Sequence, residues 1–230
     1  MGEQETRAVT LAAYAEETSA CERCALAAGR TRVVFGSGAA GAELMLVGEA
    51  PGFQEDQEGV PFVGAAGALL DRLLAAIGLA RAEVYAVNVL KCRPPGNRDP
   101  LPDEIAACEP HLFRQIELVR PRVVASLGNV ATRLLSGRDH GITRVHGREQ
   151  EVTVGDRRVL LYPLFHPAAA LYTPSMLRVL EEDFARIPAL LGRPEPAARV
   201  VDAGSAARVT PQPRVVRERE ELEPVQLGLF

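Results

Sequence analysis

The stretch from Leu44 to Gly67, LMLVGEAPGFQEDQEGVPFVGAAG, constrains the fold of this chain more than any other part of the sequence. It begins with an apolar run at 44–47 that ends in glycine, a pattern typical of a buried strand. Glycines, a proline and Glu49 then interrupt the run, and the segment PFVG follows at 61–64. Open α/β sheets bind ligands where their strands end, and glycine lets a backbone approach a ligand closely. A carboxylate and an aromatic ring on neighbouring turns favour a flat ligand with polar edges, such as a nucleobase.

The rest of the chain alternates strand patterns with helix patterns. The expected helices are 10–28, 68–79, 102–119, 130–135 and 175–191. Further strands are expected at 84–90 and 122–127, with a hairpin of 150–154 and 158–162, and loops at 91–102 and 163–173. Such alternation predicts an α/β fold, in which helices cover both faces of a parallel sheet.

Composition and charge exclude several classes of protein. The chain has 230 residues, of which 47% are hydrophobic and 24% charged, values typical of a globular domain with room for a tail. A net charge of -4 gives no overall basic field, so any contact with nucleic acid must come from a local patch. The polar first residues do not form a signal peptide, and no apolar run approaches the ~20 residues of a membrane helix. We therefore expect a cytoplasmic protein with no membrane contact.

The four cysteines are Cys21, Cys24, Cys92 and Cys108. Cysteines of cytoplasmic proteins are more often metal ligands than disulfides. The first two form a C-x2-C pair, whose spacing lets two thiolates reach one metal centre, and four thiolates hold either a structural zinc or an iron–sulfur cluster. The spacing does not choose between them, and four unrelated buried thiols are the alternative. A metal centre here would tie the N-terminal helix to the 92–108 segment.

Several motifs occur in a fixed order along residues 10–191. They are GEAPG at 48–52, Glu55-Asp56, PFVG at 61–64, NVLKCRPP at 88–95 and His166-Pro167, together with the four cysteines. This ordered set closely resembles the family 4 uracil-DNA glycosylases, the iron–sulfur type of bacteria and archaea. The resemblance implies a three-layer α/β/α sandwich with a central parallel four-stranded sheet, and a [4Fe–4S] cluster on the four cysteines. It also implies a monomer that hydrolyses the N-glycosidic bond of deoxyuridine in DNA during base excision repair.

Three side chains match the demands of uracil recognition that the resemblance implies. The target base must leave the duplex and enter a pocket, where Phe62 would stack on its face. The Asn88 amide offers one donor and one acceptor, which match O4 and N3–H of uracil. His166 would donate to O2 as negative charge develops there. An ordinary core phenylalanine and a turn asparagine are the alternatives, and we expect surface or structural roles for the other histidines, His111, His140 and His146.

The general base is open at this stage. Glu49 is the first candidate, because a carboxylate near the sugar orients water and stabilises positive charge on the deoxyribose. Relatives with a GQDPY motif use an aspartate where this chain has Ala50, which lies in the uracil-binding segment but cannot activate water. Glu55 is the second candidate, and its position resembles that of a tyrosine that blocks the 5-methyl group of thymine in those relatives. A solvated acidic loop is the alternative for Glu55 and Asp56.

Contacts to DNA are expected after His166. The segment at 167–172 resembles the loop that these enzymes push into the minor groove, and we expect Leu171 to fill the gap left by the flipped base. Arg178 is the candidate for a phosphate contact. One family variant bonds covalently to the abasic sugar through a histidine in the loop after the cluster cysteine. The corresponding loop here, 93–102, contains no histidine, so we expect ordinary turnover.

The composition changes after Gly192, which divides the chain into an expected glycosylase domain at 1–192 and a tail at 193–230. Proline, alanine, arginine and glutamate dominate residues 193–224, a composition typical of a disordered linker. The last five residues, QLGLF, resemble the peptide by which bacterial repair proteins dock on the sliding clamp. The docking residues would be Gln226, Leu227, Leu229 and Phe230, and a chance apolar end is the alternative.

Three other functions compete with uracil excision at this stage. A related glycosylase would remove other deaminated bases, such as hypoxanthine or xanthine, although the glutamate of GEAPG favours the uracil-preferring group. A non-catalytic iron–sulfur module that binds DNA would keep the fold and cluster without turnover. A zinc-binding hydrolase on an unrelated fold would use the cysteines differently.

Overall fold

A computed structural model describes residues 2–155 and 157–193 of the chain. The expected tail lies almost entirely outside these residues, and so does the clamp-binding peptide expected at its end. Both therefore remain predictions from the sequence.

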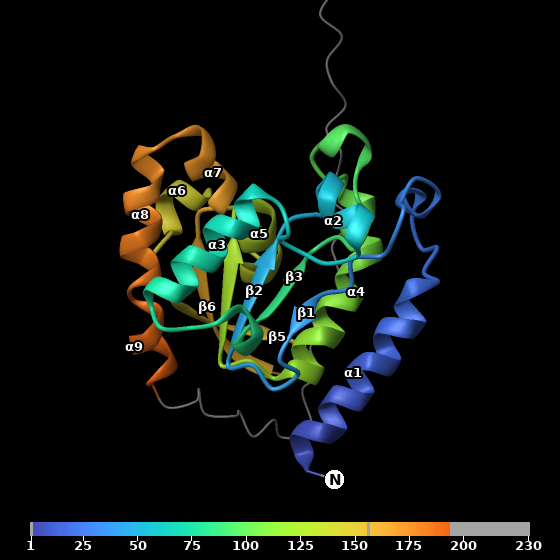
Figure 1. Ribbon diagram of the computed structural model, residues 1–230, viewed down its shortest axis with the longest axis horizontal. Coiled ribbons are helices and arrows are strands. Elements are labelled where there is room, and N and C mark those ends of the chain that lie inside the picture. Colours follow the sequence, from blue (N-terminus) through green and yellow to red (C-terminus); the bar gives the residue numbers. More distant parts are fainter. Residues whose placement is uncertain (1, 156, 194–230) are drawn as a thin grey trace, which may run out of the picture. The chain divides into compact units, whose positions relative to one another are not determined.

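A six-stranded sheet with the order β1-β3-β2-β4-β6-β5 forms the centre of the fold (Figure 1). The four inner strands β3, β2, β4 and β6 run parallel, which confirms the expected four-stranded parallel sheet. The edge strands β1 and β5 are antiparallel to their neighbours, and β5 pairs with β6 as the predicted hairpin. The strands are β1 (Ser37–Gly38), β2 (Leu44–Gly48), β3 (Tyr85–Asn88), β4 (Val123–Leu127), β5 (Gln150–Val154) and β6 (Arg157–Leu164).

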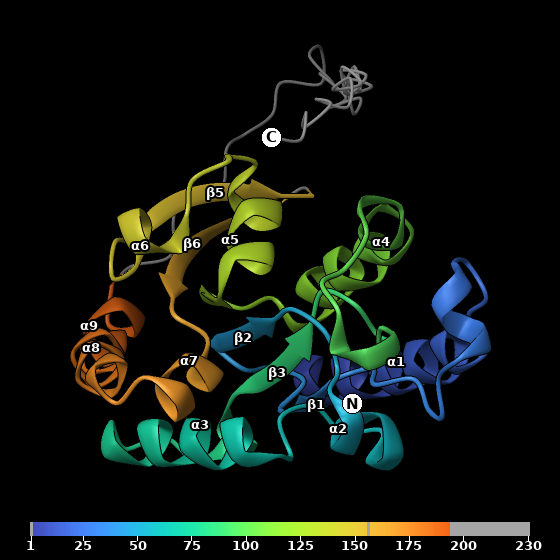
Figure 2. The ribbon, with the colours of Figure 1, turned by 90° about the horizontal axis from the view of Figure 1, so that it is seen from above.

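Helices cover both faces of the sheet, so the domain has the predicted three layers (Figure 2). One face carries α3 (Ala65–Ala76), α7 (Pro167–Tyr172), α8 (Ser175–Phe184) and α9 (Ile187–Leu191). The other carries α4 (Pro102–Val119) and α5 (Asn129–Ser136), with α1 (Glu3–Ser19) packed on α4. The remaining helical segments are α2 (Phe53–Glu58), α6 (Ile142–Val145), η1 (Ala25–Ala28), η2 (Arg81–Glu83) and η3 (Pro95–Asn97).

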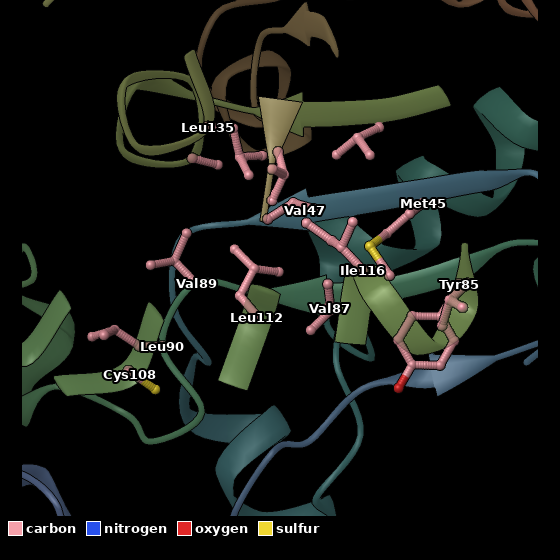
Figure 3. Packing of buried hydrophobic residues seen from close by; sticks show 14 of the residues in the cluster. Met45, Val47, Tyr85, Val87, Val89, Leu90, Cys108, Leu112, Ile116 and Leu135 are labelled. Atoms are coloured by element: carbon pink, nitrogen blue, oxygen red, sulfur yellow. The ribbon is translucent and has the colours of Figure 1, made fainter. Parts of the chain in front are cut away.

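The strand β2 shows why the sheet is buried on both sides. Each of its five residues is buried, and successive side chains point to opposite faces. Leu44 and Leu46 pack in the core under α3, α8 and α9. Met45 and Val47 pack in the second core, toward Leu112 and the rest of α4 (Figure 3). A continuous apolar run is therefore stable as a strand, because each buried leucine contributes about 1.5–3 kcal/mol.

Several elements differ from the expectations, among them α6 at 142–145, where no helix was expected. The N-terminal helix begins at Glu3 and ends at Ser19, before the first cysteine, where a helix over 10–28 was expected. The expected loop at 163–173 contains the end of β6 and all of α7, and the expected loop after Gly48 contains α2. The last helix is divided into α8 and α9, because Pro188 lies in the first turn of α9 and cannot donate a backbone hydrogen bond to a helix continuing through it.

Candidate active site

The carboxyl ends of the four parallel strands surround one cavity of about 360 Å³. Glu49 follows β2, Asn88 ends β3, Gly128 follows β4 and His166 lies just beyond β6. Every side chain predicted to contact uracil or to act in catalysis lines this cavity, namely Glu49, Ala50, Glu55, Phe62, Asn88 and His166. The structure therefore brings together residues that lie more than a hundred positions apart in the sequence.

Gly48 allows the base-contact side chains to meet. The register of β2 and β3 pairs Gly48 with Asn88. A Cβ atom on Gly48 would lie 2.3 Å from Oδ1 of Asn88 and 2.7 Å from Cζ of Phe62, far inside van der Waals contact. The absence of a side chain at 48 is therefore what places the amide beside the aromatic ring.

Asn88 is held within the protein interior and is not a turn residue. Only 3% of its surface is exposed, and its backbone carbonyl accepts a hydrogen bond of 2.6 Å from Nζ of Lys91. Lys91 is the single lysine of the chain and is itself buried. Burial lowers the pKa of Lys91 to about 7, against the opposing effect of the Cys108 and Cys92 thiols. The only sign of this buried contact in the sequence is the position of Asn88 among apolar neighbours.

Phe62 belongs both to the core and to the cavity. It packs in the core under α3 and is 8% exposed, while its ring lines the cavity. Its φ of 58° lies in the left-handed region, which is costly for a residue with a side chain. Gly67 accommodates this turn, because a Cβ there would lie 1.7 Å from the Phe62 carbonyl oxygen. The ring is tilted by only 23° from that of His166, with centroids 6.0 Å apart.

His166 presents a defined nitrogen to the cavity. Its Nδ1 accepts a hydrogen bond of 3.2 Å from the backbone N–H of Ala168, which caps the N-terminus of α7. An accepting Nδ1 places the ring proton on Nε2. Burial lowers the pKa of His166 to about 4, with Glu55 acting in the opposite direction. The imidazole is therefore neutral at pH 7 and carries one N–H donor.

Two acidic residues that line the cavity, Glu49 and Glu55, and the neighbouring Asp56 differ in their surroundings. Burial, followed by the charge of Asp99, raises the pKa of Glu49. Glu55 accepts backbone N–H groups from Gly52 at 3.1 Å and Gly64 at 3.4 Å, so its carboxylate holds two turns of the cavity wall together. Asp56 is buried and accepts from the Thr31 backbone at 2.9 Å. The alternative of a solvated acidic loop is thus wrong for this pair.

The loop after β3 forms a side of the cavity that the sequence did not identify. Pro94, Asn97 and Arg98 line the cavity. The guanidinium of Arg98 donates to both oxygens of the buried Glu104, at 2.9 and 2.5 Å. This contact lowers the pKa of Glu104, whose carboxylate also accepts from the Leu101 backbone. The start of α4 therefore anchors the loop.

The two residues predicted to contact DNA lie outside the cavity on exposed surfaces. Leu171 lies on α7, one turn after His166, and is 43% exposed. Tyr172 beside it is 86% exposed. Arg178 on α8 is highly exposed and lies 3.8 Å from Glu182, one turn away on the same helix. An apolar residue on a short helix at the rim has the exposure that insertion into DNA requires.

The four cysteines meet beside α4. All four line one small pocket between the turn after α1, the segment after β3 and α4. Two donors point at sulfur: the Lys91 N–H lies 3.3 Å from Cys108, and Arg30 Nη1 lies 3.6 Å from Cys92. Nε2 of His111 also lies 3.3 Å from the sulfur of Cys21. Burial raises the pKa of Cys92 to about 11 and also raises that of Cys108. Within the described ranges, no group of three or more His, Cys, Asp or Glu residues has the arrangement of a site for a single metal ion.

The remaining histidines have the expected structural or surface positions. His111 is buried, bonds to the hydroxyl of Tyr14 at 2.7 Å and has its pKa lowered to about 4 by burial. His146 pairs with Asp183 at 2.8 Å, and His140 is exposed. The contact between His111 and Cys21 had no signal in the sequence, because the two are 90 residues apart.

Comparisons with known proteins agree with this geometry. A model of the uracil DNA glycosylase superfamily matches residues 35–187. The chain therefore belongs to the uracil DNA glycosylase superfamily. It is similar to the type-4 uracil-DNA glycosylase of Sulfurisphaera tokodaii, with 46% identity over 75% of this chain and 80% of that protein. The protein of the same name from Saccharolobus solfataricus is 46% identical over 75% of this chain and 82% of its own length. That from Archaeoglobus fulgidus is 45% identical over 78% of this chain and 92% of its own length.

A separate observation concerns membranes. Among the helices that the structure describes, none combines the length and the apolar character needed to cross a bilayer.

Proposed function

We propose that this protein excises uracil from DNA by hydrolysing the N-glycosidic bond of deoxyuridine, which leaves an abasic site for base excision repair. The reaction class is that of a DNA glycosylase, a hydrolase acting on N-glycosyl bonds. The observation that carries the proposal is the meeting of an amide, an aromatic ring, a neutral imidazole and a carboxylate in one cavity. A cavity of about 360 Å³ is in the range of small-ligand sites and accepts a single flipped base.

Selection of uracil would depend on the Asn88 amide. Its NH2 group would donate to O4 of uracil, and its oxygen would accept N3–H. Cytosine presents an amine and a bare ring nitrogen at these places, so both pairs would be lost in a buried site that holds the amide in this orientation. Each unpaired buried group costs about 1–3 kcal/mol, which compounds to a large loss of rate. The small Ala50 would leave room for the base, and Glu55 would stand as a steric gate against a 5-methyl group.

His166 and Phe62 would act on the leaving group. As the bond breaks, negative charge develops on O2 of uracil, and the N–H at Nε2 of His166 would donate to it. A neutral donor suits this task, because it needs no proton transfer and stays in one state across the physiological pH range. Phe62 would stack on the base and hold its plane in line with both polar contacts.

Glu49 would serve as the general base. It directly follows β2 at the cavity wall, where a carboxylate would orient water toward the sugar and stabilise its developing positive charge. A pKa raised by burial makes its carboxylate a stronger base. Glu55 is the weaker candidate, because both of its oxygens already accept backbone hydrogen bonds.

Binding of DNA would bring the rim helix α7 against the minor groove. Leu171 would occupy the space that the flipped nucleotide vacates, and Arg178 would contact a phosphate. The exposure of both side chains supports these roles. Unstacking a base costs a few kcal/mol, and an apolar wedge offsets part of that cost.

The four thiols of Cys21, Cys24, Cys92 and Cys108 would hold a [4Fe–4S] cluster. The residues present fit such a group, because four sulfurs line one small pocket, and Lys91 N–H and the Arg30 guanidinium donate to two of them. Burial raises the pKa of Cys92 and Cys108, and the positive charge of bound iron would favour their thiolate forms. The cluster would tie the turn after α1 to α4. Iron and sulfide contents near four per chain, with visible absorbance, would support it, whereas a colourless protein loaded with zinc would refute it.

Three further proposals rest on the sequence. The one on the tail concerns residues 194–230, which lie outside the described part of the chain. Residues 1–192 form the glycosylase domain, which works as a monomer in the cytoplasm. The tail tethers it to the sliding clamp through Gln226, Leu227, Leu229 and Phe230. Deleting residues 226–230 should abolish capture by purified clamp while leaving excision from short oligonucleotides unchanged. Undiminished capture would disprove the tether.

A panel of substrates tests the proposed function against its alternatives. Oligonucleotides carrying one uracil, hypoxanthine, xanthine or thymine are incubated with the protein, and abasic sites are converted to breaks by alkali. We expect breaks with uracil and far fewer with the other bases. Preferred cleavage at hypoxanthine or xanthine would assign a different lesion, and binding without cleavage of any substrate would make the protein a non-catalytic module.

A further inference from the structure

Arg81 lies directly behind the ring that is proposed to stack on uracil. It begins the short segment η2 after α3, and its guanidinium carbon is 5.4 Å from the centroid of Phe62. Its Nη2 donates to the carbonyl of Pro61 at 2.8 Å, and its Nη1 is 3.6 Å from Oδ1 of Asp71. The arginine therefore contacts both the Phe62 ring and the backbone that leads into its left-handed turn.

The Phe62 ring borders two separate cavities. The first is the uracil cavity, which includes Asn88 and His166 but not Arg81. The second, of about 290 Å³, is lined by Arg81 and Asp71 but by neither of those two residues. Arg81 therefore reaches Phe62 from outside the uracil cavity and makes no contact with the site of the base itself.

A charged residue in this position is costly. The Arg81 side chain is 25% exposed, and its Nη1 is fully buried with no hydrogen-bond partner in the described part of the chain. Burial lowers the pKa of Arg81, but an arginine starts so high that it stays charged at neutral pH. An apolar side chain of similar length would fill the space without this desolvation penalty. Packing alone therefore does not account for the arginine.

The electrostatics of the excision step provide a role for the charge. An aromatic face carries partial negative charge, so it opposes the growth of negative charge on a base stacked against it. A cation over the ring is attracted to the π electrons and draws them away from the opposite face. The cost of stacking an anion on Phe62 falls as a result.

We infer that Arg81 is a positioning residue for base excision. It fixes Phe62 in its strained turn, and it places a positive charge behind the Phe62 ring as the uracil leaves as an anion. This inference rests on the proposed function and goes beyond it, because Arg81 does not line the cavity proposed to hold the base. The effect belongs to the transition state, since only there does the base carry negative charge. Ground-state binding of DNA should depend on Arg81 only weakly.

The test compares two leaving groups under single-turnover conditions, with the protein in excess over DNA containing uracil or 5-fluorouracil. Fluorine withdraws electrons and stabilises the departing anion, so this base needs less help from the protein. Arg81→Met should slow uracil excision about tenfold and 5-fluorouracil excision about twofold, as expected for losing a partly desolvated cation–π contact. Arg81→Gln retains a donor for Pro61 without the charge and should behave similarly. Arg81→Lys retains the charge and should restore most of the rate.

Arg72→Met is the matched control, because Arg72 is an exposed arginine on the neighbouring helix α3. It should leave both rates, the melting temperature and the dissociation constant for DNA unchanged. Equal losses on the two bases in the Met and Gln variants would reduce Arg81 to a structural residue and overturn the inference. The inference would also be overturned if the Arg81 variants lost only affinity for DNA, or if Arg81→Lys excised uracil as slowly as Arg81→Gln. A wild-type protein that excises neither base would overturn the proposed function itself. If the wild type is active and the Arg81 variants keep its ratio of uracil to 5-fluorouracil excision rates, only the inference is overturned.

Discussion

Replacing Gly48 with alanine should disable the cavity while leaving the fold in place. The new Cβ would lie 2.3 Å from Oδ1 of Asn88 and 2.7 Å from Cζ of Phe62. Ordinary contact distances are about 3.5–4 Å, so the amide and the ring must each move by about 1 Å. These are the two groups that would hold the base, and a displacement of that size costs about a hundredfold in rate.

The same substitution should have a modest effect on stability. Overpacking by a methyl group typically costs about 1–3 kcal/mol, which for a domain of this size lowers the melting temperature by roughly 2–12 °C. DNA binding through the exposed rim should persist, because Leu171 lies on α7 and does not line the cavity. The loss is therefore predicted in the single-turnover rate of uracil release.

The assay measures that rate for wild type, Gly48→Ala and a control, with melting curves for each. Gly141→Ala is a suitable control, because the nearest atom to a Cβ at 141 lies 3.8 Å away and its φ of -69° suits any residue. Wild-type excision by Gly48→Ala would show that Asn88 and Phe62 do not hold the base as described. A variant that fails to fold would show that Gly48 serves the sheet and not the cavity alone.

Three further predictions concern pH, DNA and the product. Glu49 must be ionised to act as a base, and burial raises its pKa, so the single-turnover rate should fall as pH drops through a value above the ordinary 4.5. Glu49→Gln should abolish this acidic limb of the pH–rate profile. An acidic limb that persists in the glutamine variant would exclude Glu49 as the base. Leu171→Ala should reduce excision from duplex DNA more than from single-stranded DNA, where no stacked partner must be displaced; equal losses would exclude the wedge. Denaturing gels should show no protein–DNA adduct after reaction, because the loop 93–102 lacks a histidine, and a stable adduct would contradict ordinary turnover.

The sequence was sufficient to predict the parallel sheet and the residues at its strand ends. Buried parallel strands have continuous apolar runs, and their order along the chain restricts the topology. The site follows from this, because Glu49, Asn88 and His166 each end or follow such a run. The strand pattern therefore predicted where the cavity lies, whereas the roles of Phe62, Asn88 and His166 came from the resemblance to the family 4 uracil-DNA glycosylases.

Features that depend on long-range contacts were missed. Arg81 meets Phe62, and Arg98 meets Glu104, only after the chain has folded, and neither pair has a distinctive spacing. The sequence FQEDQE of α2 has no apolar periodicity, so it predicts a loop where the structure has a helix. Helix α7 was missed because its N-terminus is capped by the imidazole of His166, which is an unusual cap.

The most direct test of the central claim is the release of free uracil from a uracil-containing oligonucleotide by the wild-type protein and by Asn88→Ala. We expect the wild type to release uracil and leave an alkali-labile site. The variant should fold but release uracil at least a hundredfold more slowly, which corresponds to a loss of about 2.7 kcal/mol or more in transition-state stabilisation. Uracil release at equal rates by both proteins would contradict the claim that Asn88 reads the base in this cavity. The absence of release by wild type would contradict the assignment of uracil excision.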